Sequence, residues 1–578
     1  MSVNHIKNSS VLSRAMLWGG IALLGGHAVA HADFALKPND RVVFYGDSIT
    51  DQRLYTTFVE TYVVTRFPKL PVSFVHSGWG GDRVSGGGGG PIDLRLQRDV
   101  LAYKPTVMTI MLGMNDGAYR SFNQGIFDTY ANGYTHILDT VQKEAPGVRF
   151  TLIEPSPYDD VTRAPGFTDG YNAVLQRYGD FVKNTATAKN MNVADLNTPV
   201  VTMLQKANGT DAKTAQQLIP DRIHPGPAGH LIMAEALLKA WGAPSVVSDV
   251  SIDATADKVV RSENTKVGNL QIGDTLSWTQ SDAALPFPLD ISNPQMGLAL
   301  KSSDFVESLD REPLQVTGLK AARYTLTIDG DEIGDFGRDE LAQGINLAML
   351  ATPMTEQAQK VHRLTLKHND QHFWRWRTIQ VPLQDHNAEV QNAAPPLIKA
   401  LDDEEAETVV QQRDAAQPKP HRFELTVAVG QPTGPNLALH KTYTSNDPNV
   451  YNFGIGALTD GSWSGDNHVF ATGDNDTFPK TVTIDLGAAT PISLVRVGVP
   501  SFGSTKTIQV AVSADGQKFT DVGSHTFSLA VERRHSFNFK PVSARYVRLT
   551  YPDHYPDNVG YSPLFSFTSE VEVYAPTP

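Results

Sequence analysis

A serine, a histidine and an aspartate in the first half of the chain have the types that nucleophilic catalysis needs. Ser48 follows an apolar run that ends in glycine, within "FYGDSIT" at residues 44–50, and Asp221 and His224 lie three residues apart in "DRIHPGPAGH". A serine hydroxyl attacks an ester only when a base takes its proton, and a carboxylate can hold a histidine base in the required tautomer. We therefore predict that Ser48 is the nucleophile, His224 the base and Asp221 the residue that orients it.

Attack on a carbonyl carbon also requires hydrogen-bond donors for the oxyanion that forms. Glycine backbone N–H groups are available in "SGWGGD" at 77–82, and "GMND" at 113–116 offers an asparagine amide. The glycine donor could be Gly78, Gly80 or Gly81, and we choose Gly81 because it immediately precedes Asp82. Asn115 and the backbone N–H of Ser48, at the start of a predicted helix, complete the set. Each of these residues alone could be a helix cap or a turn residue, but their joint occurrence favours catalysis.

The elements that must position these residues alternate regularly between residues 35 and 243. Short apolar runs such as "RVVFYG" at 41–46 are separated by amphipathic stretches, and the last of these is "AGHLIMAEALLKAWG" at 228–242. This pattern predicts one three-layer α/β domain, with a parallel sheet covered by helices on both faces. Because parallel strands end at one edge of a sheet, segments far apart in sequence can meet there.

Other residues in this domain have less specific readings. We expect the run "SGGGGG" at 85–90 to be a flexible surface loop, with a substrate-facing role as the alternative. His230 is expected to be packed or solvent-facing in the final helix. Trp79, Tyr119 and Tyr158 fit either a pocket lining or a core position. Zinc hydrolysis is weakly supported, because the chain has no cysteine and no H-E-x-x-H segment.

The segments "GDSIT", "SGWGGD", "GMND" and "DRIHP" resemble, in order, the four sequence blocks of the SGNH hydrolases, also called GDSL esterases and lipases. The resemblance implies a flavodoxin-like α/β/α fold and an esterase that forms an acyl-serine intermediate without a cofactor. It also implies Ser48, Asp221 and His224 as catalytic residues and Ser48, Gly81 and Asn115 as the oxyanion hole. One difference is His76, at a position where many members have asparagine.

Residues 244–430 form a mixed α+β middle region of unknown role, which either shapes the cleft or joins the two ends of the chain. We predict strands at 324–329 and 375–383 and helices around 338–350 and 394–416.

Residues 436–578 carry short alternating strands separated by turn residues, which predicts an all-β jelly-roll sandwich. Segments such as "NLALHK" at 436–441 and "ALTDGSWSG" at 457–465 resemble the discoidin-type domains, the coagulation-factor C-type modules with a galactose-binding-like fold. The resemblance implies glycan binding and a structural calcium near Asp460 and Glu570. Three aromatic residues fit either stacking on a sugar or packing: Trp463, Phe470 and Tyr555.

The ends and the charge of the chain limit where it works and what it binds. Residues 1–32 have the basic, apolar and small-residue pattern of a secretory signal peptide, with cleavage after Ala32. The apolar core is shorter than the roughly 18–20 residues of a bilayer span, so we expect no membrane segment after cleavage. The net charge of -13 argues against nucleic acid as a partner. The absence of cysteine suits a periplasmic or secreted bacterial protein.

Together these observations predict an exported serine esterase that removes acyl groups, with acetyl favoured, from a carbohydrate or polysaccharide. A lipase, lysophospholipase or thioesterase would use the same triad, and a catalytically inactive glycan-binding protein is the alternative from another class.

Overall fold

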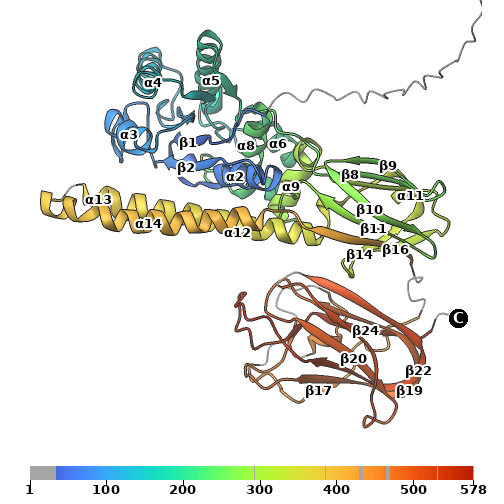
Figure 1. Cartoon of the computed structure of the whole chain (residues 1–578). Helices are drawn as coiled ribbons and strands as arrows, with labels where there is room; N and C mark the ends of the chain where they lie inside the picture. The colour runs from blue at the N-terminus through green and yellow to red at the C-terminus, as the bar shows by residue number, and fades with distance from the viewer. Residues whose placement is uncertain are drawn as a thin grey trace, which may run out of the picture.

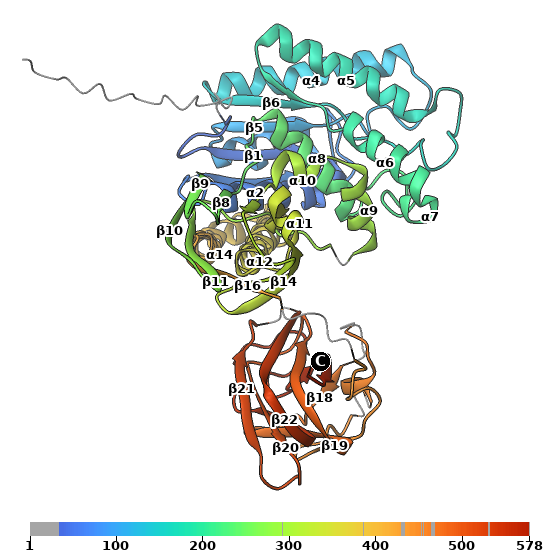
Figure 2. The same ribbon diagram turned by 90° about the vertical axis from the view of Figure 1, so that its right-hand side faces the viewer.

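The computed structural model describes residues 34–291, 293–384, 386–428, 434–451, 454, 456–463, 469–529 and 532–576. Three regions follow one another along the chain, an α/β domain, a middle region and a C-terminal sandwich, and the sandwich lies next to the middle region in both views (Figures 1 and 2). The predicted signal peptide lies outside the described residues. No described helix has the length and apolar character needed to cross a membrane.

The α/β domain is built on a five-stranded sheet in the order β2-β1-β5-β6-β7, and every neighbouring pair is parallel. The strands are β1 (Arg41–Gly46), β2 (Ser73–Gly78), β5 (Val107–Met111), β6 (Arg149–Ile153) and β7 (Asn192–Ala194). Gly46 pairs with Gly78 on one side and with Met111 on the other, so β1, β2 and β5 end at one level. The predicted doubly covered parallel sheet is confirmed.

Helices cover both faces of this sheet (Figures 1 and 2). On one face α2 (Leu54–Arg66) packs against α8 (Pro227–Ala240). On the other, α4 (Gln124–Glu144) and α5 (Gly170–Lys189) meet through the rings of Tyr130 and Tyr178, whose centroids are 4.5 Å apart. The remaining helices are α1 (Ser48–Asp51), α3 (Ile92–Asp99), α6 (Thr198–Thr210) and α7 (Ala212–Ala215).

The middle region contains two sheets, as the mixed α+β prediction requires. One has the order β15-β12-β8-β9 and the other β10-β11-β16-β13-β14. Their strands are β8 (Asp249–Asp253), β9 (Lys258–Glu263), β10 (Thr265–Ile272), β11 (Thr275–Asp282), β12 (Pro313–Thr317), β13 (Arg323–Ile328), β14 (Asp331–Gly337), β15 (Ile345–Asn346) and β16 (Pro420–Val427). Helices α9 (Pro294–Ser302) and α10 (Phe305–Leu309) pack into the core of the α/β domain, whereas α11 (Arg338–Gln343) stays with the strands.

A helical hairpin, here called the arm (residues 353–415), is inserted between β15 and β16 and lies along the α/β domain (Figure 1). It consists of α12 (Pro353–Phe373), a π-helix (Trp374–Gln380), α13 (Val381–Leu383) and α14 (Ala388–Ala415). The strand predicted at 375–383 is therefore wrong. Aromatic and β-branched residues alternate there as in a strand, but the segment continues α12 and buries Trp376 beneath the α/β domain.

Helix α12 was not expected from the sequence, although its start carries a signal. The Thr352 side chain accepts a hydrogen bond from the Thr355 backbone N–H, and Pro353 occupies the first turn. Both are typical of a helix N-terminus. Helix α14 matches the helix predicted around 394–416.

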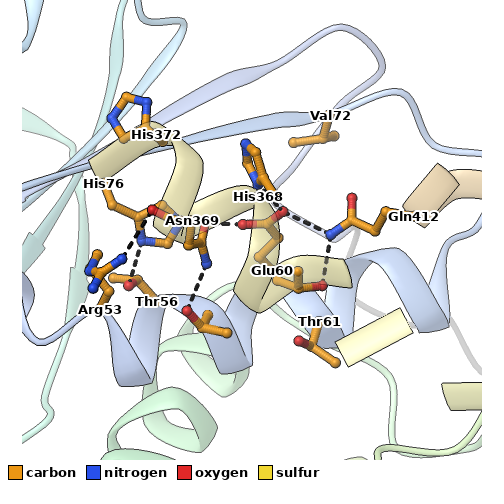
Figure 3. Close-up of polar contacts among 12 residues, drawn as sticks. Arg53, Thr56, Glu60, Thr61, Val72, His76, His368, Asn369, His372 and Gln412 are labelled. Atoms are coloured by element: carbon orange, nitrogen blue, oxygen red, sulfur yellow. Dashed lines mark hydrogen bonds and ion pairs between the residues drawn. The ribbon is translucent and has the colours of Figure 1, made fainter. Parts of the chain in front are cut away.

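A buried polar network joins the arm to α2 (Figure 3). The Glu60 carboxylate lies 3.0 Å from His368 Nδ1 and 3.2 Å from His76 Nε2, and it accepts a hydrogen bond from Gln412. His368 also contacts Glu405 through its other ring nitrogen, at 3.2 Å. Burial opposes charge here, yet Glu60 and Glu405 raise the pKa of His368 to about 10. His76, the departure from the SGNH pattern, is thus a partner of Glu60.

The C-terminal sandwich has a main antiparallel sheet in the order β17-β19-β22-β20-β21, with β24 beside β19, and a small sheet of β18 and β23. Its strands are β17 (Tyr443–Ser445), β18 (Phe470–Ala471), β19 (Lys480–Val499), β20 (Thr507–Ser513), β21 (Thr520–Thr526), β22 (Arg533–Tyr551), β23 (Phe567–Thr568) and β24 (Glu570–Tyr574). The predicted all-β sandwich is confirmed. It contacts the middle region through Arg533, which pairs with Glu356, and through His525, which lies 3.0 Å from Asp331.

Candidate active site

Ser48 lies at the first residue of α1, immediately beyond the carboxyl end of β1. Asp47 caps this short helix, because its side chain accepts a hydrogen bond of 3.1 Å from the Ile49 backbone N–H. Gly46 has no room for a side chain, since a Cβ there would lie 2.2 Å from the Thr50 hydroxyl. The strand can therefore turn sharply into the helix and present the Ser48 hydroxyl at the edge of the sheet.

His224 and Asp221 reach the same place from the loop before α8. His224 Nε2 lies 2.8 Å from Ser48 Oγ, and His224 Nδ1 lies 2.6 Å from Asp221 Oδ2. The second oxygen of Asp221 accepts hydrogen bonds from the backbone N–H groups of Ile223 and His224. Burial alone would raise the pKa of Asp221, but these hydrogen bonds and the nearby imidazole hold it below its usual value.

The three side chains form one continuous line of hydrogen-bonding groups. With Nδ1–H donating to Asp221, the Nε2 lone pair of His224 can accept the proton of the Ser48 hydroxyl. The distance of 2.8 Å is within the range of a general base and its proton donor. The arrangement can therefore generate a nucleophilic serine.

The expected oxyanion donors are the backbone N–H groups of Ser48 and Gly81 and the side-chain amide of Asn115. Within the part of the chain that the structure describes, neither the Ser48 nor the Gly81 backbone N–H donates a hydrogen bond. The N–H of Gly80, by contrast, donates to Asp51 Oδ2 at 3.1 Å, which excludes it as a free donor. Gly81 has a φ of 78°, in the left-handed region that favours glycine.

The third expected donor, Asn115, is held from two sides. Its Nδ2 donates to the Asp82 carbonyl at 3.0 Å, and its Oδ1 accepts a hydrogen bond of 2.9 Å from the Tyr119 hydroxyl. An amide nitrogen carries two hydrogens, so one remains for an oxyanion. Tyr119 therefore orients this amide, whereas the sequence indicated only a pocket-lining or a core position for it. The one signal in the sequence for this role is that Tyr119 lies four residues after Asn115.

The glycine run at 85–90 has a defined structure, so the expectation of a flexible loop is wrong. It forms a two-stranded hairpin of β3 (Gly86–Gly87) and β4 (Gly90–Pro91). A Cβ at Gly87 would lie 2.6 Å from Asp82 Oδ1, and one at Gly89 would lie 2.6 Å from the Trp79 ring. The glycines allow the hairpin to pack closely on Trp79 and Asp82, which flank Gly81.

His230 is packed in the interior, which is one of the two placements, packed or solvent-facing, expected from the sequence. It is fully buried in α8, accepts a hydrogen bond from the Tyr55 backbone N–H, and contacts Gln52 through Nε2 at 3.1 Å. Gln52 in turn donates to the Pro225 carbonyl, next to His224. His230 thus belongs to the packing beneath the catalytic loop.

The carboxylates expected to hold calcium lie in the C-terminal sandwich. Among the described residues, no group of three or more His, Asp or Glu side chains could hold a metal ion. Glu570 is buried, its Oε2 accepts a hydrogen bond from the Gly461 N–H, and its Oε1 has no partner. Burial and the nearby Asp460 raise its pKa to about 9. The unpaired oxygen beside a second carboxylate has the chemistry of a hard-cation ligand, but these two residues supply only part of the roughly six to eight oxygen ligands that Ca²⁺ takes.

The three aromatic residues singled out in the sandwich occupy different environments. Phe470 is buried against Tyr443, and the Tyr555 hydroxyl donates to the Phe527 carbonyl. Trp463 is half-buried, with its indole N–H donating to Glu572 and the Arg534 guanidinium 4.5 Å from its ring. Phe470 is therefore a packing residue.

Two parts of the chain match known families. Residues 44–232 match the GDSL-like lipase/acylhydrolase family, and residues 457–549 match the NedA-like, galactose-binding domain. An acetylxylan esterase of Geobacillus stearothermophilus is 26% identical over an alignment of 223 residues, and the alignment covers 35% of this chain and 94% of the esterase. A crystal structure of the acetylxylan esterase Axe2 from the same organism covers 36% of this chain and 96% of its own, with 25% identity and a TM-score of 0.29.

The structural similarity to one further enzyme is more extensive. A gut microbial diltiazem-metabolizing enzyme has 26% identity and a TM-score of 0.59, and the match covers 68% of this chain and 98% of that chain. This share exceeds the α/β domain by far, so the two proteins share structure beyond it. With its GDSL-like lipase/acylhydrolase domain at 44–232 and its galactose-binding domain at 457–549, the protein is a carboxylic ester hydrolase.

Proposed function

We propose that the protein is an exported serine esterase that removes acetyl groups from carbohydrate esters. The observation that carries the catalytic part is the line of contacts from Asp221 through His224 to Ser48. Such an arrangement is the machinery of acyl transfer through a covalent serine intermediate.

The reaction follows from these positions in two steps. Ser48 Oγ attacks the ester carbonyl carbon while His224 Nε2 takes the hydroxyl proton, and the N–H groups of Ser48 and Gly81 and the Asn115 amide stabilise the oxyanion. Collapse of the tetrahedral intermediate expels the alcohol, to which His224 returns the proton. A water molecule, deprotonated by His224, then attacks the acyl carbon on Ser48, and His224 returns that proton to Ser48 Oγ as the acid leaves.

The carbohydrate part of the proposal has separate support. The chain carries a galactose-binding domain in addition to its hydrolase domain, and one curated relative is an acetylxylan esterase. The segment at 1–32 supports export to the periplasm or the medium. We further propose that Asp460 and Glu570 hold a structural calcium in the sandwich, and that no cofactor takes part in catalysis.

The test compares release of p-nitrophenol from the acetate and the decanoate, with acetylated xylan alongside and Ser48→Ala as the blank. We expect release from the acetate and the polymer that depends on Ser48. Preference for the decanoate would favour a lipase, and no release from any substrate would favour an inactive glycan-binding protein. A chain that ends at residue 428 should lose activity on the polymer and keep it on the small ester.

A further inference from the structure

The π-helix at the tip of the arm touches the segment that carries Gly81. Arg377 Nη1 lies 3.0 Å from Asp51 Oδ1 and 3.3 Å from the Gly78 carbonyl oxygen. The guanidinium carbon of Arg377 lies 3.5 Å from the centroid of the Trp79 ring, which is a close stacking distance. A side chain of the middle region therefore contacts two residues of the segment 78–82.

Asp51 connects Arg377 to the oxyanion donor. While Asp51 Oδ1 pairs with Arg377, Asp51 Oδ2 accepts the hydrogen bond from the Gly80 N–H, at 3.1 Å. Gly80 precedes Gly81, and Asp51 is the last residue of the short helix that begins with Ser48. One carboxylate thus links the arm, the nucleophile helix and the peptide next to the Gly81 N–H.

A second line of contacts reaches the other side of Gly81. The Trp376 indole N–H donates to Asp99 Oδ1 at 2.7 Å, and Asp99 pairs with Arg95. Arg95 Nε then donates to Asp82 Oδ2 at 2.8 Å, and all three of these charged side chains are buried. The Trp376 ring also packs edge-on against Trp79, with centroids 5.7 Å apart.

Residues 78–82 depend on contacts from other segments, because Gly80 and Gly81 have no side chains that could pack and hold the Gly81 N–H in place. Gly80 and Gly81 are exposed, and a Cβ at Gly81 would meet nothing within 4 Å. An oxyanion donor contributes only when it is held in place before the reaction, and a misplacement of about 1 Å can cost about a hundredfold in rate. The π-helix adds a residue per turn relative to an α-helix, which alters the face on which the following side chains lie.

We propose that the arm positions the oxyanion hole, with Arg377 as a positioning residue that acts on Gly81 through Asp51 and Trp79. The proposal rests on the serine esterase function and assigns the middle region a part in it. An arginine suits this place because its planar group can stack on an indole and bond to oxygen atoms in its plane at the same time. A lysine could reach the carboxylate but could not reproduce the stacking.

The test measures kcat and KM for p-nitrophenyl acetate with Arg377→Met, Arg377→Lys and a control, Arg363→Met. Arg363 is an exposed arginine of α12 in the same arm, so the control makes the same chemical change away from the segment 78–82. We expect Arg377→Met to lower kcat about tenfold to a hundredfold with little change in KM, because the oxyanion forms only in the transition state. Arg377→Lys should recover part of the loss, and Arg363→Met should match the unmodified protein.

A double-mutant cycle with Asp51→Asn tests the connection. Because both residues act on the same peptide, the double variant should lose much less than the product of the two single losses. Where Arg377→Met fails to fold, Asp51→Asn alone serves as the test, with a fall in kcat expected. Unchanged kcat in a folded Arg377→Met variant, or multiplicative losses in the cycle, would overturn the proposal. Absence of Ser48-dependent activity in the unmodified protein would instead overturn the esterase function.

Discussion

The α/β domain and the C-terminal sandwich differ in how fully their polar side chains are hydrogen-bonded within the chain. In the α/β domain, strand ends in register bring Ser48, Gly81 and Asn115 together, and each has neighbours that fix its orientation. In the sandwich, the paired carboxylates leave one buried oxygen without a partner, and the Trp463 indole already bonds to Glu572. The polar groups of the first region are oriented by neighbours within the chain, whereas the second region leaves one buried carboxylate oxygen unpaired.

Removing the charge of Asp221 should have the largest effect on catalysis by the α/β domain. Asp221→Asn can present an N–H to His224 Nδ1, which favours the wrong tautomer, and kcat for p-nitrophenyl acetate should fall by about 10⁴-fold. The melting temperature of the sandwich should not change, because the substitution lies in another domain. A variant that keeps a tenth of the activity would contradict the assigned role of Asp221.

Disrupting the buried polar network around Glu60 should have the next largest effect, which is on the stability of the fold. His368→Gln should lower the free energy of unfolding by about 3 kcal/mol, because it breaks a buried ion pair. Since the folded protein raises the pKa of His368 from 6.5 to about 10, this stabilisation is complete below pH 6.5 and is lost as the pH rises through 10. Denaturant unfolding of both proteins at pH 6 and pH 10 measures the difference, and a difference that grows with pH would contradict the charged pair.

Tyr119→Phe tests whether the Tyr119 hydroxyl orients the Asn115 amide in the α/β domain. The change removes the hydroxyl that bonds to Asn115 Oδ1 and leaves the ring packing against Tyr171 in place. We expect kcat to fall by about tenfold, the cost of loosening one oxyanion donor, while KM changes little. A matched variant is Tyr158→Phe, whose hydroxyl has no contact with Asn115; equal losses in the two variants would argue against a specific role of Tyr119.

Calcium removal tests whether a bound cation stabilises the C-terminal sandwich. A chelator should lower the melting temperature of the sandwich by a few degrees, because a ligand that binds only the folded state stabilises it. The Ser48-dependent hydrolysis of p-nitrophenyl acetate should remain unchanged. Glu570→Gln should remove the response to the chelator, and a response that persists in this variant would exclude Glu570 as a ligand.

The sequence was most informative where chemistry and local structure coincide. Ser48, Asn115 and the Asp221–His224 pair could be proposed because each lies beside a strand end or a helix start that the apolar pattern reveals. Their convergence then follows from the parallel sheet.

The arm was difficult to predict for the opposite reason. Arg377 is separated by 326 residues from Asp51, so no local pattern connects them. The π-helix has the alternation of a strand, and only the packing of Trp376 decides its conformation. The glycine run likewise resembles a linker, because nothing in its composition indicates that Trp79 and Asp82 lie against it.

The arm also changes what a minimal fragment of this protein would be. Strand β2 forms one edge of the five-stranded sheet, and the arm lies against it, with Arg413 donating to the carbonyl oxygens of Leu70 and Val72 just before the strand. A fragment cut at residue 243 would expose this strand, and an uncovered edge is a template for intermolecular pairing. We expect such a fragment to aggregate, and a fragment that extends through β16 at residue 427 to stay soluble.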